Sequence, residues 1–207
     1  MTQYWGRLSL ERPDFQLSVY EDDRPVAVGN TVPLRWDGTV ADLPAGIDGA
    51  LERAFVEEGA DVLCALLIEV ASAQQGRGVS RRVLEAMTEL ARTHGLDGLV
   101  APVRPNWKER YPLVPIDRYS EWRRADGLLF DPWMRVHERL GARVLKPEPQ
   151  SLRITGTVGE WESWTEMAFP ESGEYVFPRG LALLAIDRAA DVGSYWEPNV
   201  WMLHEGE

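Results

Sequence analysis

The chain has 207 residues, 44% of them hydrophobic and 27% charged, a composition typical of an ordinary globular protein with a substantial core. We therefore expect a single domain over residues 1–207. The formal net charge of −11 would repel phosphate backbones, which excludes nucleic acid as the main partner and favours a cationic small molecule. No apolar run reaches about 18 residues, and Met1–Trp5 lacks the order of a signal peptide. A cytoplasmic protein without a membrane partner is the expectation.

Phe15–Tyr20 and Pro25–Trp36 have strand-like patterns around a polar turn, which predicts an antiparallel hairpin. Gly46–Val56 has one apolar helical face and predicts a short amphipathic helix. Val62–Val70 is almost continuously apolar and too short to span a membrane, so it suits a strand that is covered on both faces. We expect this strand at the centre of the sheet.

Cysteine and histidine are sparse. Cys64 is the single cysteine and lies inside the apolar run, so we expect a buried core thiol rather than a nucleophile. His94, His137 and His204 are widely separated, and there is no paired-cysteine motif. We therefore expect no metal site.

The pattern changes to a helical period at Ser80, with a stop at His94-Gly95. Leu99–Val103 then has the pattern of the next strand. These segments complete a strand, helix, strand unit, which should cross over with the right hand. The apolar stripe of this helix consists of Val83, Leu84, Met87, Leu90 and Ala91.

A further helix is predicted to begin after Asp131. Asp131 is a suitable N-cap, and Pro132 follows at the first helical position. That helix should end near Gly141. Ser151–Thr157 predicts a strand, and Thr157–Glu160 is a capping box that opens a short helix. We expect residues 158–207 to form a β-rich C-terminal elaboration, with further short strands at 175–177, 181–186 and 200–203.

A long connection rich in Pro, Trp and Tyr, Arg104–Phe130, separates that helix from the preceding strand. A loop of this length inside a domain is usually a lid or a binding element. The alternative is a loop whose aromatic side chains simply cover the sheet. As candidate substrate-binding residues we name Asn106, Trp107, Tyr111, Tyr119 and Trp122.

The most informative feature is the cluster of Arg77, Arg81 and Arg82 at the start of the helix that follows the central strand, in a chain that is otherwise acidic. Helix N-termini carry positive partial charge and attract anions. Glycines beside Arg77 would let backbone N–H groups approach a phosphate closely. The alternative is a glycine-containing turn with solvated arginines. A P-loop is excluded because there is no Gly-Lys pair, and a Rossmann fingerprint would need a glycine at Arg81.

The segment Gln75-Gly76-Arg77-Gly78-Val79-Ser80 resembles the signature of the GNAT superfamily. In that signature, Gln or Arg, two residues, Gly, one residue, and Gly or Ala bridge an apolar strand to a helix. Ser80 is the departure at the last position, and its hydroxyl could serve as an N-cap. Val136–Ala142 is similar to the family's later aromatic, Tyr, Glu, Lys, Leu, Gly, Phe segment. The resemblance covers Phe15 to Thr157.

The resemblance implies an α/β GNAT fold, in which helices flank a central mixed sheet and the core spans about residues 15–157. Only 14 residues precede Phe15, so we expect a shortened N-terminus that leaves part of the acceptor-side wall unaccounted for. The family geometry implies that the central strand splays from its neighbour and that pantetheine lies in the gap. The implied contacts with acetyl-CoA are Ile68, Val70, Gln75, Gly76, Arg77, Gly78, Val79 and Ser80.

Acyl transfer to an amine requires a neutral amine near the thioester, so a base must accept a proton and an acid can protonate the leaving thiolate. Glu69 is the only ionisable side chain of the central strand, and apolar surroundings would raise its pKa and suit a base. The alternative is a solvated carboxylate. His137 stands where the family often places a Tyr acid, and imidazole could do the same near neutral pH. The alternative is a structural histidine.

These observations predict an enzyme, an acetyl-CoA dependent N-acyltransferase that acts on a primary amine of a small molecule by direct attack. The alternative is a catalytically inactive GNAT-fold module that binds coenzyme A as a sensor. The sequence does not name the acceptor or the acyl length, because irregular loops carry no readable specificity code. The sequence is compatible with a homodimer and does not specify the oligomeric state.

Overall fold

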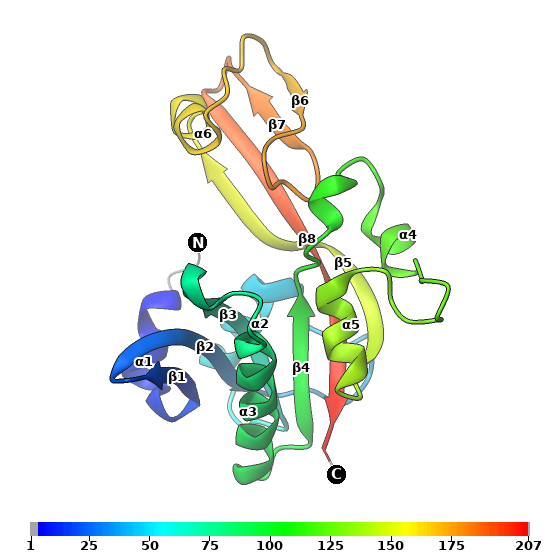
Figure 1. Cartoon of the computed structure of the whole chain (residues 1–207). Coiled ribbons are helices and arrows are strands. Elements are labelled where there is room, and N and C mark those ends of the chain that lie inside the picture. Colours follow the sequence, from blue (N-terminus) through cyan, green and yellow to red (C-terminus); the bar gives the residue numbers. More distant parts are fainter. Residues whose placement is uncertain (1–3, 207) are drawn as a thin grey trace.

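The computed structural model describes residues 4–206, in which eight strands form one mixed sheet (Figure 1). Its order is β1-β2-β3-β4-β8-β7-β6, and β5 pairs with β8 off this path. The strands are β1 Gln16–Glu21, β2 Arg24–Leu34, β3 Val62–Val70, β4 Gly98–Val103, β5 Arg143–Gly156, β6 Gly173–Tyr175, β7 Leu184–Asp187 and β8 Val192–Glu205. The helices are α1 Leu8–Glu11, α2 Gly46–Val56, α3 Val79–Thr93, α4 Ile116–Ser120, α5 Pro132–Arg139 and α6 Val158–Thr165. The expected mixed α/β fold is confirmed, and no helix within residues 4–206 could span a bilayer.

Helices cover both faces of the central strands, which explains the continuous apolar run of β3. Leu63 and Ala65 pack into the core beneath α3, while Val62 and Cys64 pack into the core beneath α2. Burial raises the pKa of the Cys64 thiol well above its usual range. This cysteine is therefore the inert core residue that the sequence predicts.

Helix α3 packs on the sheet through the predicted stripe, in which Val83, Leu84 and Met87 are fully buried. Gly29 of β2 makes this close approach possible. A Cβ atom at that position would lie 2.6 Å from Cε of Met87 and 2.8 Å from Cγ1 of Val83. The apolar spacing and this glycine together set the distance between helix and sheet.

Asp131 begins α5 as predicted, with Pro132 at the first helical position. Its carboxylate accepts hydrogen bonds from the backbone N–H groups of Trp133 and Met134. The same carboxylate accepts from the N–H of Trp107 at 2.7 Å and from the hydroxyl of Tyr119 at 2.9 Å. One buried N-cap therefore also holds the long 104–130 connection against the helix.

The C-terminal part differs from the expected elaboration. The outer halves of β5 and β8, with α6, β6 and β7, form an arm that projects from the sheet (Figure 1). The arm has its own apolar cluster, which includes Trp161, Phe169 and Tyr195. The inner half of β8 instead returns to the centre, where Val200–Glu205 pairs with β4. Residue 157 therefore does not divide core from elaboration, because a single 14-residue strand belongs to both.

Short helical turns occupy Trp5–Phe15, ahead of the first strand. Leu8 is buried in the core beneath α2, and Trp5 packs against the same core. The helical turns ahead of β1 thus supply some of the wall on this side of the sheet.

Candidate functional site

The neighbouring parallel strands β3 and β4 pair at only two positions, Leu63 with Leu99 and Cys64 with Val100. A bulge in β3 follows, because Asn30 and Thr31 of β2 lie opposite Leu67 and Ala65 and leave Leu66 without a partner. Beyond the two pairs the strands separate, and a cleft of about 520 Å³ opens between them. The structure therefore has the splay that the resemblance implies.

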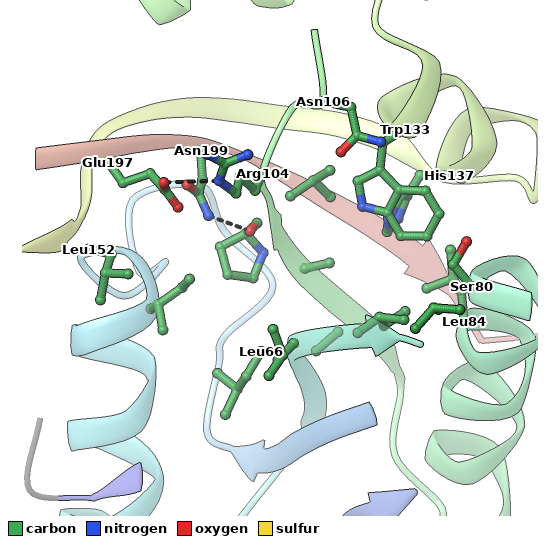
Figure 2. Close-up of a pocket in the computed structure, with 18 of the residues that line it drawn as sticks. Leu66, Ser80, Leu84, Arg104, Asn106, Trp133, His137, Leu152, Glu197 and Asn199 are labelled. Carbon is green, nitrogen blue, oxygen red and sulfur yellow. Dashed lines mark hydrogen bonds and ion pairs between the residues drawn. The ribbon is translucent and has the colours of Figure 1, made fainter. Parts of the chain in front are cut away.

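The cleft has two ends of different character (Figure 2). The α3 end lies beside the helices of one face of the sheet, and we define it by Ser80, Leu84, Trp133 and His137. The β8 end lies on the opposite face, near α2, and we define it by Arg104, Leu152, Glu197 and Asn199. The cleft thus connects two separate environments through the gap in the sheet.

At the α3 end, the helix start has no side-chain cap and no acidic residue in its first turn. The N-cap is Gly78, which is left-handed with a φ of 76°, and Gly76 has the same value. The expectation that Ser80 caps the helix is wrong, since Ser80 is the second helical residue and lines the cleft. The first-turn N–H groups therefore have no side-chain acceptor, which is the condition of an anion-binding helix start.

Two of the three arginines at this helix start, Arg77 and Arg81, have acidic or polar neighbours. The guanidinium of Arg77 donates to the side chain of Gln74 and lies 3.7 Å from Glu21, and that of Arg81 lies 3.0 Å from Glu85. Their charges are partly neutralised on the surface, so the backbone amides and the glycines are the stronger argument for an anion here.

The eight expected cofactor contacts divide into two groups. Ile68, Val70, Gln75 and Ser80 line the cleft. The side-chain amide of Gln75 donates to the carbonyl of Val70 at 3.4 Å and ties the loop to the strand. The other four do not line it: Gly76, Arg77 and Gly78 are exposed beside the mouth, and Val79 is buried in the core.

His137 lines the cleft but is 2% exposed, and its Nδ1 lies 2.9 Å from Nε2 of His204. Burial, with a smaller contribution from the His204 ring, lowers the pKa of His137 to about 3. His137 is therefore neutral at neutral pH. The expectation of an imidazole acid titrating near neutral pH is wrong, because this site disfavours the charged ring.

The hydrogen bond between the two histidines determines what His137 presents to the cleft. Burial also lowers the pKa of His204, and the nearby backbone of Leu140 opposes this only in part. When the Nδ1 atom of His137 carries the hydrogen and donates it to Nε2 of His204, no hydrogen remains on the other ring nitrogen of His137. The Nε2 atom of His137, buried and unpaired within residues 4–206, is then a bare acceptor.

Glu69 is exposed and does not line the cleft. The neighbouring residues Leu67, Ile68 and Val70 of β3 line the cleft, but Glu69 does not. The apolar surroundings expected for this carboxylate are absent, and the alternative of a solvated side chain is what the structure has.

The β8 end contains polar groups that the sequence analysis missed. The Nε atom of Arg104 donates to Glu197 Oε2 at 2.9 Å, and the Nδ2 atom of Asn199 donates to the carbonyl of Pro102 at 2.7 Å. Asn199 is fully buried, and within the described residues its Oδ1 has no hydrogen-bond partner. More than 90 residues separate the members of each pair, so no local motif marks them.

No known family model matches the chain. Arginine N-acetyltransferase avaD of Aspergillus versicolor is 32% identical over an alignment 236 positions long, which covers 98% of this chain and 80% of that protein. The chain belongs to the GNAT superfamily. The predictions of this family and of an N-acyltransferase enzyme are thereby confirmed.

Two solved structures of GNAT-like proteins share the fold. The loading GNATL domain of CurA from Lyngbya majuscula superposes with a TM-score of 0.64 at 18% identity, covering 96% of this chain and 80% of that one. The GphF GNAT-like decarboxylase, in complex with isobutyryl-CoA, has a TM-score of 0.60 at 15% identity, covering 96% and 82%. At these identities the likeness concerns the fold alone.

The long connection of this GNAT domain is a packing element rather than an acceptor wall. Of the five expected substrate-binding residues, only Asn106 lines the cleft. Tyr119 is buried, and the rings of Tyr111 and Trp122 pack edge to face at 5.0 Å. Trp107 packs against Phe130 at 5.5 Å. The expectation for these four aromatic residues is corrected, because none of them lines the cleft. Tyr111, Tyr119 and Trp122 belong to the core cluster of the sheet, and Trp107 packs on Phe130.

Proposed function

We propose that this GNAT domain transfers the acetyl group of acetyl-CoA to an amine of a small molecule by direct attack. The observation that carries the proposal is one continuous cleft, which joins the uncapped start of α3 to the gap between β3 and β4. Membership of the GNAT superfamily supports the reaction type.

The donor would occupy the α3 end. Amides of the Gly76–Ser80 turn would bind the pyrophosphate, because they lie at a helix start without a side-chain cap. Pantetheine would run through the gap beside Ile68 and Val70, whose β3 backbone has no β4 partner at that level. Gln75 and Ser80 would contact the chain between these two parts.

The acceptor would enter from the β8 end. The relative from Aspergillus versicolor is named for arginine, and a net charge of −11 favours a cationic small molecule. Arginine is therefore the first acceptor to test. Attack by its neutral amine forms the C–N bond and breaks the C–S bond, and the thiolate that leaves takes up a proton.

We assign His137 an accepting role in this reaction. Its Nε2 would receive a hydrogen bond from an N–H group of the bound substrates and hold that group in place. A pKa of about 3 makes the ring a weak base, so the amine proton would leave through water. Glu69 takes no part in this scheme, because its carboxylate lies outside the cleft.

The test is to incubate the purified chain with acetyl-CoA and arginine and to measure free thiol and acetylated arginine together. The proposal expects equal amounts of both products. Acetyl-CoA alone should raise the melting temperature, since a ligand at a hundredfold excess over its Kd adds about 2.7 kcal/mol of stability. Stabilisation without thiol release over a panel of amines would instead support a binding module.

A further inference from the structure

We propose that Glu197 and Asn199 form an acceptor subsite that binds a planar cationic group, a guanidinium, at the β8 end of the cleft. The inference rests on the proposed function and names the part of the acceptor that is recognised. Both residues line the cleft, and both belong to β8. As alternate residues of one strand, they project from the same face of the sheet.

The orientation of the Asn199 amide is determined by its contact with the sheet. Since Nδ2 donates to the Pro102 carbonyl, the remaining atom Oδ1 must be the oxygen, and it can only accept. This oxygen is buried without a partner among residues 4–206. Unpaired buried acceptors are rare in native proteins, so an N–H donor from a ligand is the natural partner.

Glu197 provides a carboxylate for a cation, and its ion pair with Arg104 neutralises that charge only in part. It is the only carboxylate among the described residues that line the cleft, and its side chain is 13% exposed. Arg104 occupies Oε2 and is held in turn by the carbonyl of Arg179 at 3.0 Å. A carboxylate can accept several hydrogen bonds, so Oε1 stays available to a ligand donor.

The chemistry of the reaction decides which group binds there. The amine that attacks the thioester must be neutral, whereas a carboxylate at the β8 end favours a charged group. One acceptor molecule satisfies both conditions if it carries an attacking amine and a second, permanently charged group. A guanidinium fits, because its planar set of N–H donors can reach the acceptor oxygens of both side chains.

The decisive experiment compares arginine with citrulline, its neutral ureido isostere, as acceptors of the full chain. We expect kcat/KM to favour arginine by at least about tenfold, which corresponds to about 1.4 kcal/mol. Glu197→Gln should bring that ratio close to one, because the amide keeps the shape and loses the charge. Glu205→Gln is the matched control: it removes a β8 carboxylate paired with Arg143 at 2.9 Å, outside the cleft, and should keep the parental ratio.

Asn199→Leu tests the neutral half of the subsite. It should raise KM for arginine and for citrulline alike, because both present N–H groups, and it should leave the Kd of acetyl-CoA unchanged. If this variant does not fold, the parental ratio and Glu197→Gln still decide the proposal.

The outcomes separate the subsite from the function. If the parent chain acetylated none of the amines, the proposed function would be refuted. Turnover with equal kcat/KM for arginine and citrulline, or an undiminished preference in Glu197→Gln, would overturn the subsite and leave acyl transfer intact.

Discussion

The two ends of the cleft are built in different ways. The α3 end is built mainly on one continuous segment, from Gln75 to Leu84, which runs from a loop into a helix, and α5 adds Trp133 and His137. The β8 end uses side chains of Arg104, Glu197 and Asn199, which are brought together by strand pairing across the sheet. A donor common to a whole family can be held by a local motif, while acceptor recognition depends on tertiary structure and can change without disturbing that motif.

The largest effect is expected from a substitution at the α3 end of the cleft. Gly78→Val should weaken acetyl-CoA binding by about a hundredfold or more, on the order of 3 kcal/mol, because a β-branched residue disfavours the φ of 76° that starts α3. Nothing lies within 4 Å of a Cβ atom at this position, so the defect would be one of backbone conformation. Calorimetric titration with acetyl-CoA measures it.

Gly59→Val is the matched control for that experiment. Gly59 has a φ of 85°, equally open surroundings and no place in the cleft lining. It should lose stability to a similar extent and bind acetyl-CoA as the parent does. Equal binding by parent and Gly78→Val would show that the phosphate contacts lie elsewhere.

A smaller effect is expected from a substitution of His137, the member of the His137–His204 pair that lines the cleft. His137→Phe keeps an aromatic ring in place and removes the Nε2 acceptor, so kcat should fall by about fivefold, in line with the loss of one hydrogen bond of roughly 1 kcal/mol. Steady-state kinetics at saturating acetyl-CoA measure this, and the melting temperature reports the cost of leaving His204 unpaired. Normal turnover with lowered stability would make His137 a structural residue only.

The same pair predicts a pH dependence of folding. His137 has a folded pKa of about 3, below the value near 6.5 of an unfolded histidine. Between those values the unfolded chain binds the extra proton, so the free energy of unfolding should fall as the pH drops from about 6.5 toward 3. Burial of His204 acts in the same direction. Urea unfolding at a series of pH values should show a weaker dependence in His137→Phe than in the parent.

The smallest effect is expected outside both ends. Glu69→Gln should leave kcat/KM for arginine nearly unchanged across the pH range, because this exposed carboxylate does not line the cleft. A flattened acidic limb in the pH profile of the variant would instead return Glu69 to the mechanism as a base.

Local patterns predicted much of the fold. The bounds of α2 and β3 agree with the expected ranges, and Asp131 and Thr157 cap their helices as expected. These features depend on neighbours within a few residues, where spacing and capping chemistry are informative. The glycine-containing turn before α3 could be predicted for the same reason.

The remaining features depend on distant partners. The bulge at Leu66 decides which β3 side chains reach the cleft, and an apolar run cannot reveal its position. Pro147 and Pro149 lie inside β5, which hid its length, and β8 contains Pro198. Without that strand the sequence could not place Asn199 beside Pro102. The aromatic connection was misinterpreted because composition does not distinguish rings that face a ligand from rings that face one another.

Strand β8 links three parts of the molecule through one continuous backbone. Tyr195 belongs to the core of the arm, Glu197 and Asn199 to the cleft, and His204 to the pair that orients His137. A hinge or an insertion in the arm would therefore act first on the proposed acceptor subsite, whereas the turn at residues 76–80 belongs to a different segment of the chain. When relatives of this protein evolve to use a different acceptor, we expect the substitutions to accumulate in the arm and along the outer half of β8. The turn at residues 76–80 should be preserved.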